Sequence, residues 1–234
     1  MARSGGKQCR RQLLISGVKA GLPIALGYLP LAVSFGVLAA QVPLSVPQSV
    51  LMSVIVYAGA SQFMAVNMLL LGAAGAEVVL AAFVVNFRHF IMSMSLAGRW
   101  SRHPKWVQTL LSLGVTDETF AVASMAERDL TERPHFMAGL MLCAYGAWVS
   151  GTAIGGLMSI FVPPELGSRM VIALYAMFIG LLVPSVRRSW ALLAVAAAGA
   201  LLNTLLRPVL GTGWSIIAAA CVAALLGISL LDDA

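Results

Sequence analysis

Long apolar runs fill most of the chain, and charged residues stand between them. No Asp, Glu, Lys or Arg occurs between Lys19 and Glu77, and residues 134–164, 191–206 and 208–231 are also free of them. A membrane-spanning helix needs about 20 consecutive apolar residues, and a soluble core of this size would interleave charged turns. The pattern therefore predicts an all-α integral membrane protein, a polytopic helical bundle.

The same pattern predicts how the chain crosses the membrane. Residues 1–19 carry a cluster of basic residues and are expected to form a cytoplasmic tail before an uncleaved first span. The remainder, residues 20–231, is expected to be a single transmembrane domain with a cytoplasmic C-terminus. About six full spans are predicted, at residues 20–42, 77–97, 135–162, 168–184, 190–206 and 213–231. A cytoplasmic loop is expected at 127–134 and an external turn at 163–167.

Residues 47–72 form an apolar stretch that Gly59 interrupts, with the polar Ser61 and Gln62 just after it. It is either one broken crossing or two half-helices that enter and leave on the same side. The second interpretation is favoured because it keeps the basic cluster at 99–105 on the side of the basic N-terminus. Each half would be about 11 residues, or roughly 17 Å, and would reach the middle of a ~30 Å hydrocarbon core.

A second re-entrant or interfacial segment is expected over residues 106–126, where two adjacent acids lie in a modestly apolar stretch. Two such segments of opposite entry side would fit inverted structural repeats with a site at the midplane, although the sequence shows no clear internal similarity. Within the first span, Pro30 predicts a broken or kinked helix. Ordinary tight packing through the small residues around it is the alternative.

Composition narrows the function classes. Hydrophobic residues make up 60% and charged residues 10% of the chain, against about 25% charged residues in soluble domains. The net charge of +6 comes from clusters that flank apolar runs, which is typical of cytoplasmic loops and not of a nucleic-acid surface. The three cysteines are far apart, so neither a metal site nor a cofactor is expected. No enzyme motif is present, and an enzyme is not expected.

Arg88 is the most informative single residue, because it lies near the middle of the predicted span 77–97. A charge at that depth costs about 2.5–3.5 kcal/mol on insertion scales, and such residues usually face a bundle interior or a water-filled cavity. Arg88 is too far from the helix end at Ala97 to reach the membrane surface easily. We expect it to bind substrate or to form an internal ion pair.

Other polar residues surround this position in the sequence. Asn86, His89 and Ser93 share one helix face, nearly opposite to Arg88, and His89 is either a packing residue or a proton relay. Asp117 and Glu118 point about 100° apart on a helix, so they cannot act as a paired dyad. One of the acids could meet Arg88 or a substrate ammonium. The alternative is a helix N-terminus capped by Thr116 or Asp117, with Glu118 in the first turn; both interpretations stay open for Asp117, and the cap is favoured for Glu118.

The start of the second half-helix, near Ser61 and Gln62, could bind an anionic group through free backbone N–H groups. A packed glycine kink is the alternative. Phe63, Met64 and Phe90 could line an apolar pocket that separates aliphatic side chains only weakly. The residues proposed to bind substrate are Ser61, Gln62, Asn86, Arg88 and Asp117. The residues proposed for proton coupling are His89, Asp117 and Glu118.

Four motifs together carry a family resemblance: GLPIALGYLPLAVSFGVLA, YAGASQFMAVNMLL, VVNFRHFIMSMSLA and TDETFAV, spanning residues 21–122. In this order they resemble the AzlC family, the large subunit of the AzlC/AzlD (YgaZ/YgaH-like) branched-chain amino acid exporters. The resemblance implies efflux of valine, leucine and isoleucine, with methionine as a further candidate, across the cell (inner) membrane. It also implies a small AzlD-like membrane partner, for which the glycine-rich surface at 151–156 offers a lipid-facing packing site.

Three other functions compete with the secondary exporter. The chain could be the permease subunit of an ABC-type amino acid transporter driven by a separate ATPase, although it has no P-loop of its own. A membrane-embedded enzyme would need a catalytic motif that the sequence lacks. A structural subunit would not explain why Arg88 and the polar breaks are retained within apolar runs.

Overall fold

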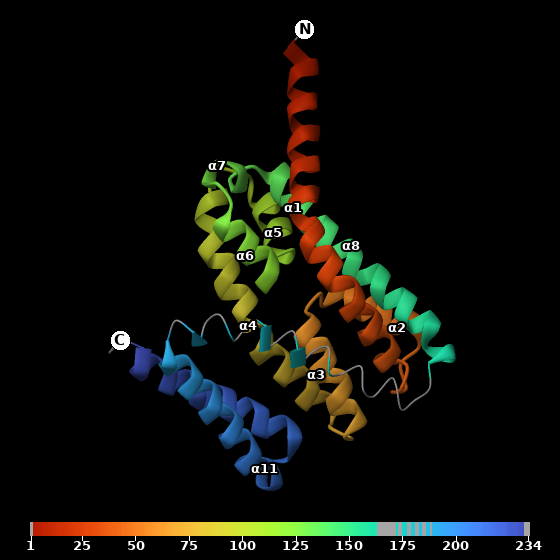
Figure 1. The fold of residues 1–234 in the computed structure, drawn as a ribbon, viewed down its shortest axis with the longest axis vertical. Coiled ribbons are helices and arrows are strands. Elements are labelled where there is room, and N and C mark those ends of the chain that lie inside the picture. The colour runs from red at the N-terminus through yellow and green to blue at the C-terminus, as the bar shows by residue number, and fades with distance from the viewer. Residues whose placement is uncertain are drawn as a thin grey trace. The chain divides into compact units, whose positions relative to one another are not determined.

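The computed structural model of the protein describes residues 2–162 and 189–231, with a few scattered residues between them. Every regular element in this part of the chain is a helix, which confirms the predicted all-α fold (Figure 1). In chain order the elements are α1 (Ala2–Ala39), α2 (Val46–Ile55), α3 (Gly59–Leu70), α4 (Gly75–Trp100), α5 (Lys105–Leu113), α6 (Asp117–Met125), α7 (Arg128–Thr131), α8 (Pro134–Met158), the short 3-10 helix η1 (Ser159–Phe161) and α11 (Trp190–Leu231).

Four of these helices are long and apolar enough to cross a membrane: Arg10–Ala39, Gly75–Trp100, Pro134–Phe161 and Trp190–Gly211. A shorter apolar helix follows at Gly213–Ile228. Five of the six predicted spans therefore correspond to apolar helices. The first helix starts earlier than expected, because α1 already includes most of the residues assigned to the basic tail. The predicted span 168–184 and the turn 163–167 lie outside the continuously described residues.

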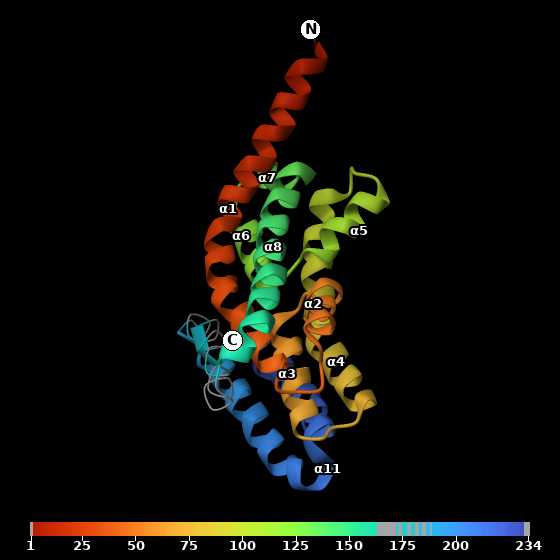
Figure 2. The ribbon, with the colours of Figure 1, turned by 90° about the vertical axis from the view of Figure 1, so that its right-hand side faces the viewer.

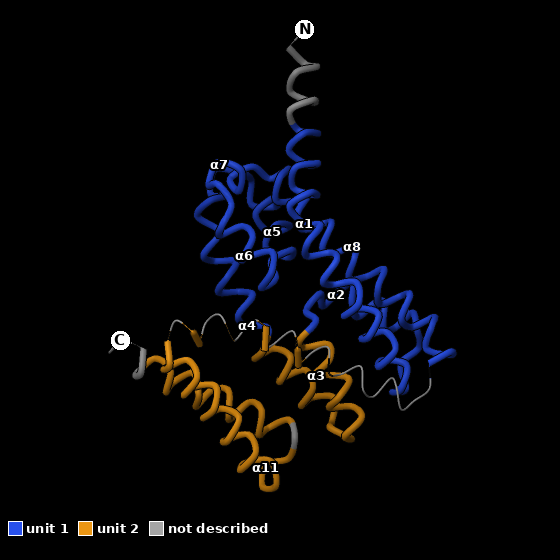
Figure 3. The backbone as a smooth tube through the Cα atoms, in the orientation of Figure 1, with its two compact units in different colours: residues 1–59, 86–163 blue, residues 60–85, 164–234 orange. Residues whose placement is uncertain are grey.

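The chain divides into two compact units, each built from stretches that are distant in sequence (Figure 3). Unit 1 contains Met1–Gly59 and Asn86–Pro163, and unit 2 contains Ala60–Val85 and Pro164–Ala234. Arg88 and Asp117 therefore belong to unit 1, whereas Ser61 and Gln62 belong to unit 2.

The centre of unit 1 is the contact between α1 and α8, which lie side by side over much of their length (Figures 1 and 2). Glycines on both helices make this contact close. A Cβ atom built on Gly17, Gly36, Gly139 or Gly155 would lie only 2.0–2.3 Å from a backbone carbonyl oxygen of the facing helix. The expectation that residues 151–156 face lipid is therefore wrong, since Gly151, Gly155 and Gly156 are buried within the chain.

No break occurs at Pro30, because α1 is one continuous helix that includes Pro23 and Pro30, and a kink there stays a prediction. A proline removes one backbone hydrogen bond and disturbs the helix locally. Here the close contacts of Gly17 and Gly36 with α8 lie on either side of the two prolines and hold both parts of α1 against the same neighbour. The alternative interpretation, tight packing through small residues, describes this helix better.

The predicted interruption of residues 47–72 is present, but it falls just before Gly59. The chain leaves α2 after Ile55, Tyr57 adopts a positive φ of 43°, and α3 begins at Gly59. Gly59 is needed for packing and not for the break itself, because a Cβ atom on it would lie 2.6 Å from the Trp148 ring. Whether the two half-helices form a re-entrant element stays a prediction.

Residues 106–126 form two helices of 9 residues each, α5 and α6. Each is about 14 Å long at 1.5 Å per residue, so neither can cross a ~30 Å hydrocarbon core alone. The break between them lies at residues 114–116, and this is where the two adjacent acids begin α6. Whether these two helices form a re-entrant or interfacial segment stays a prediction.

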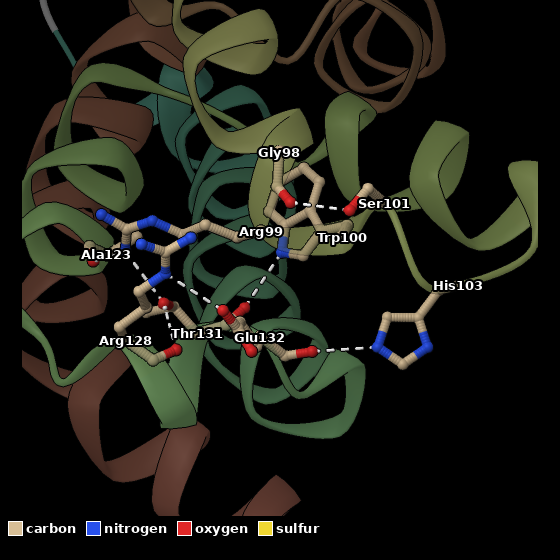
Figure 4. A network of polar contacts seen from close by, with 9 residues as sticks. All are labelled: Gly98, Arg99, Trp100, Ser101, His103, Ala123, Arg128, Thr131 and Glu132. Atoms are coloured by element: carbon tan, nitrogen blue, oxygen red, sulfur yellow. Dashed lines mark hydrogen bonds and ion pairs between the residues drawn. The ribbon is translucent and has the colours of Figure 1, made fainter.

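The end of α4 is connected to α6 and α7 by a polar network (Figure 4). Arg99 Nη1 donates to the Ala123 carbonyl oxygen and to Thr131 Oγ1, both at 2.8 Å. Trp100 Nε1 donates to the Thr131 carbonyl oxygen at 3.0 Å. The guanidinium of Arg99 thereby binds one of the last carbonyl groups of α6, which have no partner within the helix.

Unit 2 contains α3, the first part of α4, and α11. The α11 segment is two helices with a break at Gly211, which has a φ of 76° that favours glycine. The first helix approaches the second closely at Gly199, where an added Cβ atom would lie 3.2 Å from Cβ of Ala223. After the break, Gly213 packs against Glu77 at the start of α4.

Candidate functional site

The polar side chains of unit 1 meet at the start of α6. Arg88 is 13 residues from the start of the 26-residue helix α4, and its Nη2 atom lies 3.0 Å from Asp117 Oδ2. Their side chains are 34% and 27% exposed, so the pair is partly shielded from solvent. The internal ion pair considered from the sequence is therefore present. Arg88 Nε is also buried, and it has no hydrogen-bond partner among the described residues.

Local helix chemistry places the two acids. Thr116 is the N-cap of α6, and it forms a capping box in which its side chain and that of Thr119 bond to each other's backbone N–H groups. Asp117 and Glu118 then occupy the first turn, where the positive end of the helix dipole stabilises carboxylates. Part of the predicted cap is thus present, since Thr116 itself caps the helix.

The two acids contact different elements. Asp117 pairs with Arg88 of α4, whereas Glu118 accepts a hydrogen bond from the Tyr28 hydroxyl of α1. The Tyr28 oxygen also lies 2.8 Å from Thr116 Oγ1. A hydroxyl carries a single proton, so Tyr28 donates to Glu118 and accepts from Thr116. Glu118 is more than a capping residue, because it connects α6 to the first long helix.

Aromatic residues surround this hydrogen bond. The Tyr28 ring meets the Trp148 ring of α8 edge to face, with centroids 5.4 Å apart, and Phe35 stacks on the same indole. At the break after α2, the ring of Tyr57 packs against Tyr145 at 4.9 Å. The hydroxyl of Tyr57 is buried and has no hydrogen-bond partner among the described residues.

The other predicted residues are placed as follows. Asn86 Oδ1 is buried without a hydrogen-bond partner in the described part of the chain. His89 is half-buried and lies within electrostatic reach of Arg88 and Glu118. Ser61 and Gln62 are fully buried in the first turn of α3, in unit 2. In the described ranges no three His, Cys, Asp or Glu side chains gather in a way that could hold a metal ion.

Comparison with known proteins shows which family has this architecture. Residues 23–162 match the family described as AzlC protein. The chain belongs to the AzlC family. It is 35% identical over 199 residues to the inner membrane protein YgaZ of Escherichia coli, which covers 80% of this chain and 79% of that protein.

Two further members of the AzlC family extend the comparison. An uncharacterized membrane protein of Archaeoglobus fulgidus is 32% identical over 80% of this chain and 82% of its own length. The branched-chain amino acid transport protein AzlC of Bacillus subtilis is 28% identical over 60% of this chain and 56% of its own length. No solved structure matches the chain. Family membership and the apolar helices together indicate a multi-pass membrane protein with a role in membrane transport.

The AzlC match contains the whole polar cluster, from Tyr28 to Trp148. Sequence reasoning identified Arg88, Asp117 and Glu118 but missed the tyrosines and the tryptophan. A signal for them exists, because Tyr28 and Tyr57 each place a polar hydroxyl within an apolar run beside Gly or Pro residues. Buried tyrosine hydroxyl groups usually need a partner, so these positions were candidates for contacts between helices.

Proposed function

We propose that this chain exports branched-chain amino acids across the cell (inner) membrane, together with a small AzlD-like membrane subunit. The substrate class is supported by the name of the Bacillus subtilis relative. The observation that carries the site is the ion pair between Arg88, in the middle of the apolar helix α4, and Asp117 at the start of α6. Ionisable groups at such a depth are costly and usually mark a substrate or ion pathway.

A zwitterionic substrate needs both donors and acceptors. An amino acid must lose water at both ends to enter the membrane interior, so the protein has to supply donors to its carboxylate and acceptors to its ammonium. In unit 1, Arg88, Asp117 and Asn86 are proposed as substrate-binding residues, and His89, Asp117 and Glu118 as candidates for proton coupling. In unit 2, the backbone N–H groups at the start of α3, beside Ser61 and Gln62, are proposed separately as donors for an anionic group, because they lie in the first turn of a helix.

Counterflow of labelled valine in proteoliposomes tests the proposed function. Vesicles that contain this chain and its small partner, preloaded with unlabelled valine, are expected to accumulate the label without ATP, and isoleucine and leucine should compete. The single chain is expected to be poorly active. An absolute requirement for a cytosolic ATPase would instead favour the permease subunit of an ABC-type transporter. If counterflow is absent both without and with such an ATPase, amino acid transport is rejected.

The orientation is proposed from the distribution of basic residues, with both termini in the cytoplasm. If residues 47–72 form a re-entrant element, the loop between α3 and α4 is external and the loop after α4 is cytoplasmic. Single cysteines at Ala74 and Arg102, in a chain without its native cysteines, would then react with an impermeant thiol reagent from opposite sides. Labelling of both positions from the same side would reject the re-entrant arrangement.

A further inference from the structure

The polar cluster at the start of α6 contains more negative than positive charge. Arg88 and Asp117 neutralise each other across 3.0 Å. Glu118, the next residue, has the Tyr28 hydroxyl as its hydrogen-bond partner among the described residues. Tyr28 orients this carboxylate but does not balance its charge. Among Arg88, Asp117 and Glu118, the cluster therefore has two carboxylates and one guanidinium.

A lone carboxylate among apolar helices is costly unless a cation approaches it. The guanidinium of Arg88 is already paired with Asp117, and no ion pair involving Glu118 occurs in the described ranges. Asp117 is thus the neutralised acid of the cluster, and Glu118 is the acid that can accept a positive group. This separation of roles follows from the contacts, and it differs from the sequence analysis, which favoured a capping role for Glu118.

A second group near Glu118 points to a ligand. The Tyr57 side chain is 7% exposed, and its hydroxyl has no hydrogen-bond partner in the described part of the chain. Tyr57 stands two residues before Gly59, which packs on the same Trp148 ring that meets Tyr28. A buried hydroxyl without a partner is unfavourable by about 1–3 kcal/mol, and an ammonium group bound to Glu118 would supply a hydrogen-bond donor for it.

The surrounding rings hold Tyr28 in place. Its hydroxyl donates to Glu118, and its ring packs edge to face against the Trp148 ring. Gly59 leaves room for the indole of Trp148, because any larger residue there would collide with that ring. The excess carboxylate favours a cation over an anion as its ligand, and the packed rings fix its orientation through Tyr28.

We propose that Glu118, oriented by Tyr28, binds the α-ammonium group of the transported amino acid, with the Tyr57 hydroxyl as a second acceptor. In this arrangement Asp117 and Arg88 form a neutral pair that supports α6. The proposal rests on the proposed transport of amino acids, and it replaces Asp117 by Glu118 as the residue that recognises the ammonium end of the substrate.

The first test compares two valine analogues on the unaltered chain with its partner. Isobutylamine keeps the ammonium group and loses the carboxylate, whereas isovalerate keeps the carboxylate and loses the ammonium group. Isobutylamine is expected to inhibit valine counterflow at a lower concentration than isovalerate, and this preference should disappear in Glu118→Gln. Equal inhibition by the two analogues in the unaltered chain would overturn the proposal.

Variants then separate binding from structure. Glu118→Gln should raise the KM for valine about tenfold or more, because a hydrogen bond to a charged group is lost. Tyr28→Phe and Tyr57→Phe should raise it less, since each keeps its ring. Glu132→Gln is the matched control, because its acid pairs with the exposed Arg128 and should leave the KM unchanged. An unchanged KM for valine in Glu118→Gln would overturn the proposal. It would also be overturned if Glu118→Gln kept normal counterflow but lost proton-driven accumulation, because Glu118 would then be a coupling residue.

Thermal stabilisation by isobutylamine keeps this test independent of transport. Stabilisation of the complex that is lost in Glu118→Gln and weakened in Tyr57→Phe supports the ammonium site, even if valine is not the transported substrate. Absence of stabilisation in the unaltered chain, under conditions where valine counterflow is observed, would overturn the site while leaving the proposed function intact.

Discussion

The contact between α1 and α8 and the polar cluster at the start of α6 lie in the same compact unit, but they use different residue types. The helix pair is held by glycines such as Gly36 and Gly155, which let the two backbones touch. The cluster is held by side chains, through the ion pair of Arg88 with Asp117 and the hydrogen bond of Tyr28 to Glu118. The glycine contact packs the helices closely but provides no polar groups. The cluster provides charged and polar groups, and these cost free energy because they are removed from water.

The two regions depend on each other, because the helix pair carries part of the cluster. Tyr28 projects from α1 and Trp148 from α8, and their rings meet with centroids 5.4 Å apart. The distance between these helices therefore sets where the Tyr28 hydroxyl meets Glu118. Small residues far from any charge thus determine the geometry of the candidate site, and variants can separate the two contributions.

The largest effect is expected from Gly155→Ala. The added methyl group would lie 2.1 Å from the Val33 carbonyl oxygen, so α1 and α8 would have to move apart. Overpacking of this kind costs about 1–3 kcal/mol or more, which exceeds the gain of about 1 kcal/mol in helix propensity. We expect a lower Tm in detergent and less folded protein in the membrane, measured by fluorescence-detected size exclusion.

The matched control is Gly146→Ala on the same helix, where an added Cβ atom meets nothing within 4 Å. This variant is expected to keep or raise the Tm. Gly36→Ala and Gly27→Ala form the same comparison on α1, with a close carbonyl oxygen in the first case and open space in the second. If the buried and open glycines respond alike, the close backbone contact does not hold the helices together.

A smaller and more specific effect is expected in the polar cluster. Arg88→Gln leaves Asp117 without its cation, and Asp117→Asn leaves Arg88 without its anion. Each single variant should lower the Tm and reduce valine transport about tenfold or more, since unpaired charges are poorly tolerated in the membrane. The double variant should recover part of the Tm and part of the transport, because neither charge then lacks a partner.

A double-mutant cycle measures this coupling. About a third of each side chain is exposed, so solvent screening reduces the recovery below that of a fully buried pair. Strictly additive changes in Tm would show that the two groups do not stabilise each other. If both single variants transport valine fully, at normal membrane levels and with the partner bound, then neither charge belongs to the site.

The network at the end of α4 is expected to affect stability alone. Arg99→Gln removes the hydrogen bonds to Ala123 and Thr131, and this should lower the Tm. The KM for valine should stay unchanged, because Arg99 is 11 residues from Arg88, or about 16 Å along the helix. Arg102→Gln is the control, since this neighbouring arginine is exposed. A changed KM in Arg99→Gln would show that the network also positions the substrate site.

Sequence reasoning found the features that depend on local chemistry. The interruption near Gly59 and the charge at Arg88 are visible because each breaks a strong apolar pattern, and the helix start at Asp117 is visible as a possible cap at Thr116. The meeting of Arg88 with Asp117 was one of several considered pairings, and the structure selects it. To predict these features, it is enough to know helix geometry and the free-energy cost of a charge in a membrane.

Features that depend on which helices are neighbours could not be predicted. Tyr28 and Glu118 are 90 residues apart, and nothing in either sequence neighbourhood indicates that α1 contacts α6. For the same reason the glycines at 151–156 were assigned to a lipid-facing surface, although α1 covers them. A glycine stripe predicts close helix packing, but it does not identify the helix that packs there.

The smallest effect is expected from the ion pair between Arg128 and Glu132. Its N–O distance of 3.1 Å is almost the same as the 3.0 Å between Arg88 and Asp117. The difference lies in solvent access, because these side chains are 75% and 36% exposed. Exposed pairs of this spacing contribute only about 0.3–0.5 kcal/mol, so Arg128→Gln should leave both Tm and valine transport within error of the unaltered chain. If Arg128→Gln lowered the Tm as much as Arg88→Gln, burial would not be what distinguishes the candidate site from the rest of unit 1.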